Sequence, residues 1–228
     1  MKTEAREFLT ASLLSSYPDA QFGDYVAELL KDELLELPES LRAMVEEFIA
    51  SEDSLDNLRS EYIDLFDRGR SSNPLYETEY GRARAMVKGH ELADISGFYK
   101  AFGLEFGVDG TQKDMVDHVA IELEFYALLL LKQDHLVKDS EGSSVVLDAR
   151  KKFLQEHLGR FVGAITQRPG VKESPFYSTL FNWCHDLIQE ECRELSVEVI
   201  PADWITGQQE PEMTDCMLRG PQLNSSVG

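Results

Sequence analysis

The stretch VDHVAIELEFYALLLLKQDH, from Val116 to His135, decides the fold. At about 100° per residue, this stretch is apolar on two opposite sides of a helix. One side carries Met115, Val119, Leu123, Tyr126, Ala127 and Leu130, and the other carries Ile121, Phe125, Leu128 and Leu129. A helix that is apolar on both sides is normally buried among other helices. We therefore expect this segment to be the central helix of a bundle.

The second side of this helix also carries polar groups. They are Asp117, His118, Glu122 and Glu124. Because these groups alternate with Phe125 and Leu129, we expect this side to border a groove instead of a dry core. A histidine close to a helix start most often caps the helix or bonds to a neighbouring loop, and this is the favoured interpretation of His118.

Helical periodicity continues through most of the chain. Further helices are expected over residues 9–17, 25–35, 41–48, 55–66, 84–102, 145–166 and 174–195. Pro18 and Gly103 act as helix stops, and Ser174 with Pro175 as a helix start. The sequence thus predicts an all-α, single-domain bundle of about eight helices over residues 1–200. An irregular tail is expected over residues 201–228, where glycine and proline recur.

Composition narrows the classes of function. The 228 residues carry a formal net charge of −20, which disfavours binding to nucleic acid or to an anionic membrane surface. No apolar run approaches the ~18–20 residues of a membrane-spanning helix, and the first residues lack the apolar core of an export signal. The three cysteines, Cys184, Cys192 and Cys216, are widely spaced. We therefore expect a reduced, cytoplasmic protein.

Motifs for chemistry are absent. No histidine has a glutamate three residues before it, and His90–Glu91 lacks the second histidine of a zinc-protease helix, so we predict no metal site. No nucleophile elbow, phosphate-binding loop or dinucleotide fingerprint is present, so we predict no catalytic residue. The alternative is a small helical metal-dependent or acid/base hydrolase using His118 with Asp117 and Glu122. An acidic, partly apolar groove favours binding of a basic and apolar peptide instead.

Four motifs follow one another along the chain. They are Tyr62, Leu65 and Phe66 in EYIDLFDRGR, then Pro74, Tyr76 and Glu77 in NPLYE, then Asp117, His118, Glu122 and Leu123, and finally Pro175, Phe176, Tyr177 and Leu180 after FLQEHLGRF. Together they resemble the TorD/DmsD/NarJ family of redox-enzyme maturation chaperones. The resemblance covers roughly residues 55–187. Val116 stands where the family usually has a proline before Asp–His.

The resemblance implies a non-enzymatic chaperone for a molybdoenzyme. Such a protein binds the N-terminal, twin-arginine-type segment of an apo catalytic subunit of the dimethyl-sulfoxide-reductase type, and assists insertion of its molybdopterin cofactor. The implied peptide-binding residues are Tyr62, Leu65, Phe66, Pro74, Tyr76, Glu77, Asp117, His118, Glu122 and Phe125. Arginines of the segment are expected to pair with Asp117, Glu122 or Glu124.

The resemblance leaves the client and the assembly state open. LFDRGR is similar to the nitrate-reductase-chaperone branch and NPLYE to the TorD branch. The client is accordingly a nitrate, selenate or chlorate reductase, or a related dehydrogenase. The resemblance implies no stably bound cofactor, with at most weak contact with GTP or transient contact with the molybdopterin cofactor. It implies a monomer or a domain-swapped dimer, with residues 138–144 as the hinge.

Overall fold

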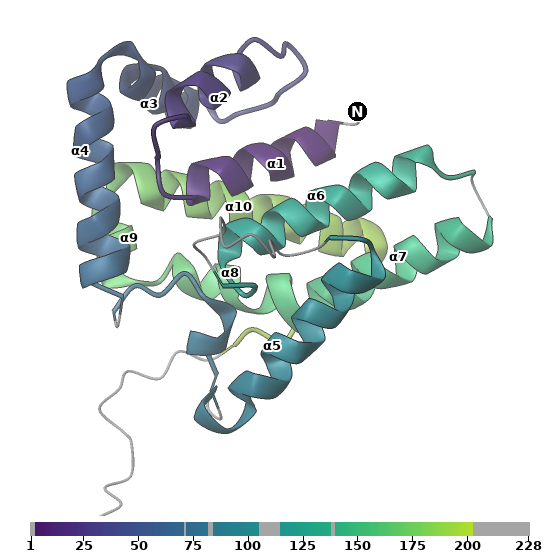
Figure 1. Ribbon diagram of the computed structural model, residues 1–228. Coiled ribbons are helices and arrows are strands. Elements are labelled where there is room, and N and C mark those ends of the chain that lie inside the picture. The colour runs from purple at the N-terminus through teal and green to yellow at the C-terminus, as the bar shows by residue number, and fades with distance from the viewer. Residues whose placement is uncertain (1–2, 71, 82–83, 105–114, 138–139, 203–228) are drawn as a thin grey trace, which may run out of the picture.

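Three helices lie at the centre of the computed structural model (Figure 1). Helix α1 (Thr3–Ser15) packs against both α6 (Val119–His135) and α10 (Pro175–Leu195). The structure describes residues 3–70, 72–81, 84–104, 115–137 and 140–202. Around the three central helices lie α2 (Phe22–Leu29), α3 (Glu39–Ala50), α4 (Glu52–Tyr62), α5 (Arg84–Ala101), α7 (Glu141–Phe153), α8 (Gly159–Ile165) and α9 (Pro169–Glu173).

Three short segments interrupt or join these helices. Two are π-helical, η1 (Ile63–Arg68) and η3 (Leu154–Leu158), and one is the 3₁₀ turn η2 (Glu77–Glu79). In the described residues, β-type backbone pairing is limited to one antiparallel bridge, between Tyr76 and His118. The predicted all-α, single-domain fold is therefore confirmed.

Helix α6 is central, as its two apolar sides predict. Leu123 on one side and Phe125 on the other are both 0% exposed. The ring of Tyr126 packs at 4.8 Å from that of Phe8 on α1, while α7 lies along α6 on another side. Burial on all sides is the arrangement that offsets the loss of chain entropy for so apolar a segment.

A buried polar contact fastens three helices together. The Tyr126 hydroxyl on α6 and the Arg150 guanidinium on α7 both donate hydrogen bonds to the Glu191 carboxylate on α10. Burial, and then the negative charge of Glu191, raises the pKa of the Tyr126 hydroxyl well above its ordinary value, so this hydroxyl stays protonated and donates. One buried carboxylate thus joins α6, α7 and α10.

Several predicted boundaries differ. The second helix ends at Leu29, and residues 30–35 form turns in which the Leu35 carbonyl accepts a hydrogen bond from Arg42 at 3.1 Å. The helix expected over residues 145–166 is divided into α7 and α8 by η3, and α9 was not predicted. The predicted tail from residue 203, with Cys216, and residues 138–139 of the predicted hinge lie outside the described residues.

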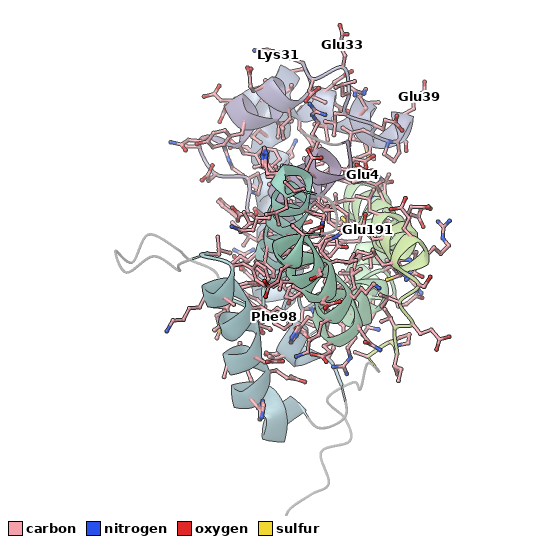
Figure 2. All side chains as sticks on the ribbon, turned by 90° about the vertical axis from the view of Figure 1, so that its right-hand side faces the viewer. Glu4, Lys31, Glu33, Glu39, Phe98 and Glu191 are labelled. Carbon is pink, nitrogen blue, oxygen red and sulfur yellow. The ribbon has the colours of Figure 1, made fainter. Side chains whose placement is uncertain are left out.

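None of the helices in the described ranges is both long and apolar enough to cross a bilayer. Acidic side chains such as Glu33 and Glu39 point away from the body of the molecule (Figure 2).

Candidate functional site

The loop that follows η1 is fastened to the start of α6. The Glu77 N–H donates to the Asp117 carbonyl at 2.9 Å, and the Val119 N–H donates to the Leu75 carbonyl at 2.9 Å. These two bonds close the antiparallel bridge and satisfy backbone groups that would otherwise be buried without partners. Two motifs that are far apart in the sequence are thereby brought into contact.

The carboxylate of Asp117 completes this junction. The side chain is 0% exposed, and its Oδ2 accepts from the Thr78 hydroxyl at 2.6 Å and from the Thr78 N–H at 3.2 Å. On the other flank, the Tyr99 hydroxyl of α5 donates to the Val116 carbonyl at 2.8 Å. Asp117 therefore serves as an anchor for the loop.

His118 is the N-cap of α6. Its Nδ1 accepts the Ala120 N–H at 3.2 Å, which confirms the capping interpretation. An imidazole that accepts at Nδ1 is neutral and carries its hydrogen on Nε2. That nitrogen lies 3.5 Å from the Tyr62 hydroxyl, and the ring meets the Tyr76 ring edge-on at 5.0 Å.

A pocket of about 370 Å³ opens beside this junction. It is lined by Tyr17, Tyr62, Ile63, Phe66, Asp67, Leu75, Tyr76 and His118. Four of the ten predicted site residues, Tyr62, Phe66, Tyr76 and His118, thus share one pocket. The Arg70 guanidinium lies 4.3 Å from the centre of the Tyr76 ring, which is a cation–π contact.

A second hollow adjoins the first. It has a volume of about 920 Å³ and shares Tyr17 with the aromatic pocket. Its lining includes the acidic residues Asp19, Asp24 and Glu52. Sequence reasoning did not single out Tyr17 or these carboxylates, because they lie outside the family motifs. They are brought together by tertiary contacts, such as the hydrogen bonds that Arg59 of α4 donates to the Pro18 and Asp19 carbonyls.

Three predicted residues lie in the core instead of the pocket. Asp117, Glu122 and Phe125 are each 0% exposed, so the expectation that this side of α6 borders a groove is wrong there. This side of α6 is buried because a loop and α5 cover it. The loop anchored by Asp117 lies across the start of α6, and the rings of Phe98 and Tyr99 on α5 pack on Phe125 at 6.4 and 4.6 Å.

The remaining predicted residues support the loop. The Pro74 carbonyl accepts a hydrogen bond from Tyr80 at 2.7 Å. Leu65 is half-buried and packs closely against Gly170 of α9. A Cβ atom added at Gly170 would lie only 2.6 Å from the Cδ2 atom of Leu65. The Glu77 carboxylate lies 3.1 Å from Nδ1 of His157, a residue of η3 that is 3% exposed.

Glu122 lies inside this acidic surrounding. Burial, followed by the negative charges of Glu77 and Asp117, raises the pKa of Glu122 well above its ordinary value. Its carboxyl group is therefore held in the neutral form. Glu122 is neutral and buried, and the buried Asp117 carboxylate accepts hydrogen bonds from Thr78. Neither group is available to a substrate as a general base, so the hydrolase alternative gains no support.

The fold and the site define an all-α protein whose polar site residues serve as caps and loop anchors. The chain belongs to the nitrate reductase delta subunit family, whose model matches residues 28–167. It is 27% identical over 177 residues to the chlorate reductase assembly chaperone protein of Ideonella dechloratans, covering 77% of this chain and 81% of that relative. It is 25% identical over 175 residues to the selenate reductase assembly chaperone protein of Thauera selenatis, covering 75% and 79%.

These comparisons confirm the resemblance to the redox-enzyme maturation chaperones. Both relatives are named as assembly chaperones, not as catalysts, in agreement with the predicted non-enzymatic role.

The first prediction concerns the loop anchor. Asp117→Ala leaves two buried donors of Thr78 without an acceptor and should lower the free energy of unfolding by about 2 kcal/mol. Asp117→Asn keeps an acceptor oxygen and should lose clearly less. Urea unfolding followed by circular dichroism measures both. Glu124→Ala, on an exposed position of the same helix, is the control, and equal stability of Asp117→Ala and Glu124→Ala would refute the anchoring role.

The second prediction concerns Glu122. With a raised pKa in the folded state, wild-type stability falls as pH rises above the ordinary carboxyl value of about 4.3, because the unfolded chain loses its proton first. Glu122→Gln is neutral throughout and has nearly the same shape. Its melting temperature relative to wild type should therefore increase from about pH 5 to about pH 8. A difference that stays constant or decreases with pH would show that Glu122 is charged in the fold.

Proposed function

We propose that this protein binds the N-terminal segment of the apo catalytic subunit of a molybdopterin reductase, and holds that subunit in the cytoplasm until its cofactor is inserted. Membership of the family and the names of the two relatives support a reductase as the client, of the chlorate, selenate or nitrate reductase class. The observation that carries the proposal is the aromatic pocket at the meeting point of three family motifs.

The pocket supplies the apolar part of recognition. Tyr62 of α4, Phe66 of η1 and Tyr76 of the loop surround a space that accepts an apolar side chain of the peptide. Burying a leucine or phenylalanine side chain there contributes about 1.5–3 kcal/mol. Aromatic walls of this kind are typical anchors of peptide binding, because they present a large area with few rotatable bonds.

The acidic surface supplies the polar part. Asp67 is exposed at the pocket, and Asp19 and Asp24 line the adjoining hollow. We propose that the arginines of a twin-arginine-type segment pair with these carboxylates. Asp117 and Glu122 are enclosed in the core beneath this surface, and Asp117 holds the loop that carries Tyr76.

A single chain is sufficient for this function. All of the described residues that line the aromatic pocket precede residue 119. We propose that exchange of helices across a hinge at residues 138–144 would therefore keep the pocket intact in either state. We propose that contacts with GTP or with the molybdopterin cofactor are weak or transient, and that the client receives the cofactor.

The third prediction concerns the peptide. Calorimetric titration with synthetic N-terminal peptides of chlorate, selenate and nitrate reductase catalytic subunits should give binding for at least one of them. Tyr76→Ala should weaken that binding by about tenfold or more, as expected for an aromatic anchor. Asp67→Asn should weaken it less and reduce its dependence on salt.

The matched control for Asp67→Asn is Glu47→Gln, an exposed carboxylate on α3. A peptide with the same composition in scrambled order controls for charge alone. Equal affinity of wild type and Tyr76→Ala, or equal binding of the scrambled peptide, would contradict the proposed pocket.

A further inference from the structure

His157 lies where three elements meet, away from the aromatic pocket. It is 3% exposed, and it stands on η3 between the η2 turn and α5. Its Nδ1 is 3.1 and 3.3 Å from the two carboxylate oxygens of Glu77. A carboxylate only accepts hydrogen bonds, so this contact places a hydrogen on Nδ1. In the neutral imidazole, the lone pair of Nε2 then points away from Glu77.

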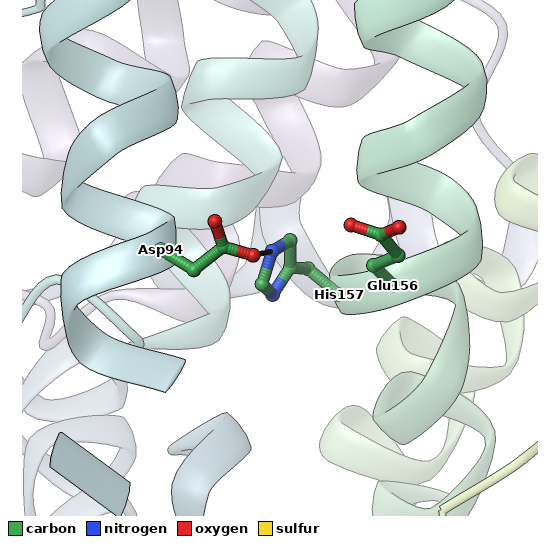
Figure 3. A group of neighbouring side chains, drawn as sticks. All are labelled: Asp94, Glu156 and His157. Atoms are coloured by element: carbon green, nitrogen blue, oxygen red, sulfur yellow. Dashed lines mark ion pairs between the residues drawn. The ribbon is translucent and has the colours of Figure 1, made fainter. Parts of the chain in front are cut away.

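Two further carboxylates lie near the His157 ring. Asp94 comes from α5, and Glu156 precedes His157 on η3 (Figure 3). One ligand atom from each of the three residues lies within 4.8 Å of the other two. The π-helical turn matters here, because it changes the angular spacing of the helix and is a form often seen at functional sites.

The Nε2 atom is buried and makes no hydrogen bond in the structure. The Oδ2 atom of Asp94 lies 3.4 Å from it. A good N–H···O bond is about 2.7–3.2 Å long. Two ligand atoms on a tetrahedral zinc ion, each about 2.0–2.1 Å from the metal, lie roughly 3.3–3.4 Å apart. The separation is therefore long for a hydrogen bond and right for two ligands that share one ion.

We propose that Asp94, Glu156 and His157 bind a divalent first-row transition-metal ion of the zinc type. Glu77 is the positioning residue, since a carboxylate on the far nitrogen is the usual means of orienting a histidine ligand. Two carboxylates with a neutral imidazole balance the charge of the ion. The side chains of Asp94 and Glu156 are 47% and 42% exposed, so the ion enters from solvent and water completes its coordination.

Two features favour occupation of this site. The net charge of −20 concentrates cations around the protein. Among the described residues, the positive side chain that pairs with Glu156 is Lys152, at 3.5 Å. Lys152 is more than half exposed, and an exposed pair of this kind contributes little, so it competes weakly with a metal ion. The sequence-based prediction of no metal site considered only motifs along one helix, whereas these ligands come from two separate elements.

The test uses the full chain, freed of metal by a chelator and dialysed. Titration with Co²⁺, followed by its visible absorption, and competition with Zn²⁺ measure binding directly. We expect one ion per chain, with Mg²⁺ competing poorly because imidazole suits transition metals better than Mg²⁺. Asp94→Asn and Glu156→Gln should each weaken Co²⁺ binding by about tenfold or more, since each removes one of three protein ligands.

Control variants distinguish binding at this site from nonspecific binding of cations to the acidic surface. Glu46→Gln and Glu47→Gln remove exposed carboxylates on α3 and should leave Co²⁺ affinity unchanged. His157→Asn is the third ligand variant. His157 is buried, so its variant could fail to fold. In that case the variant of the exposed Asp94 tests the proposed site. Absence of saturable binding, or equal affinity of Asp94→Asn and the α3 controls, would show that protonated His157 only pairs with Glu77 and Asp94.

Discussion

The hydrogen bonds between the Asp117 carboxylate and Thr78 are the constraint on which both candidate sites depend. They hold the loop that follows η1 against the start of α6, together with the two backbone bonds of the bridge. Side chains on a bridged strand alternate between its two faces. Tyr76 is thereby placed at the aromatic pocket beside His118, while Glu77 meets His157. One anchor thus positions one residue for each site.

Burial of so many carboxyl groups is costly, and the structure offsets that cost in different ways. Asp117 is compensated by hydrogen bonds from Thr78, Glu77 by His157, and Glu191 by Tyr126 and Arg150. Glu122 is compensated by remaining protonated. Removing one partner of such a group leaves a buried charge or donor unsatisfied, whereas an apolar pair in its place would be tolerated. We infer that these contacts specify where the loop and the helices that they join lie more than they add to stability.

The sequence predicted the fold well because helical periodicity reports burial directly. The two apolar sides of α6 required a central position, and Ser174 with Pro175 marked the start of α10. Periodicity shows which side of a helix is apolar or mixed, but it does not show what covers that side. The groove expected beside Glu122 and Phe125 is closed by a loop and by α5, whose contacts span long stretches of the chain.

The candidate sites were predictable only in part, for a similar reason. Tyr62, Phe66, Tyr76 and His118 could be named because each lies in a family motif, although their shared pocket required the tertiary structure. His157 was overlooked because its partners, Glu77 and Asp94, come from other elements and not from its own helix. Its place in the FLQEHLGRF segment was the one signal in the sequence that could have indicated it.

The central claim is that the pocket beside Tyr76 receives the N-terminal segment of a client reductase. Site-specific photo-crosslinking tests it most directly. A benzoylphenylalanine is placed at position 76, or at Val145 on the exposed face of α7 as control, and the protein is mixed with the apo catalytic subunit. We predict that mass spectrometry locates the crosslink from position 76 within the N-terminal segment of the client, and finds none from position 145. Crosslinks from position 76 confined to the folded body of the client, with the N-terminal segment captured from position 145, would contradict the account.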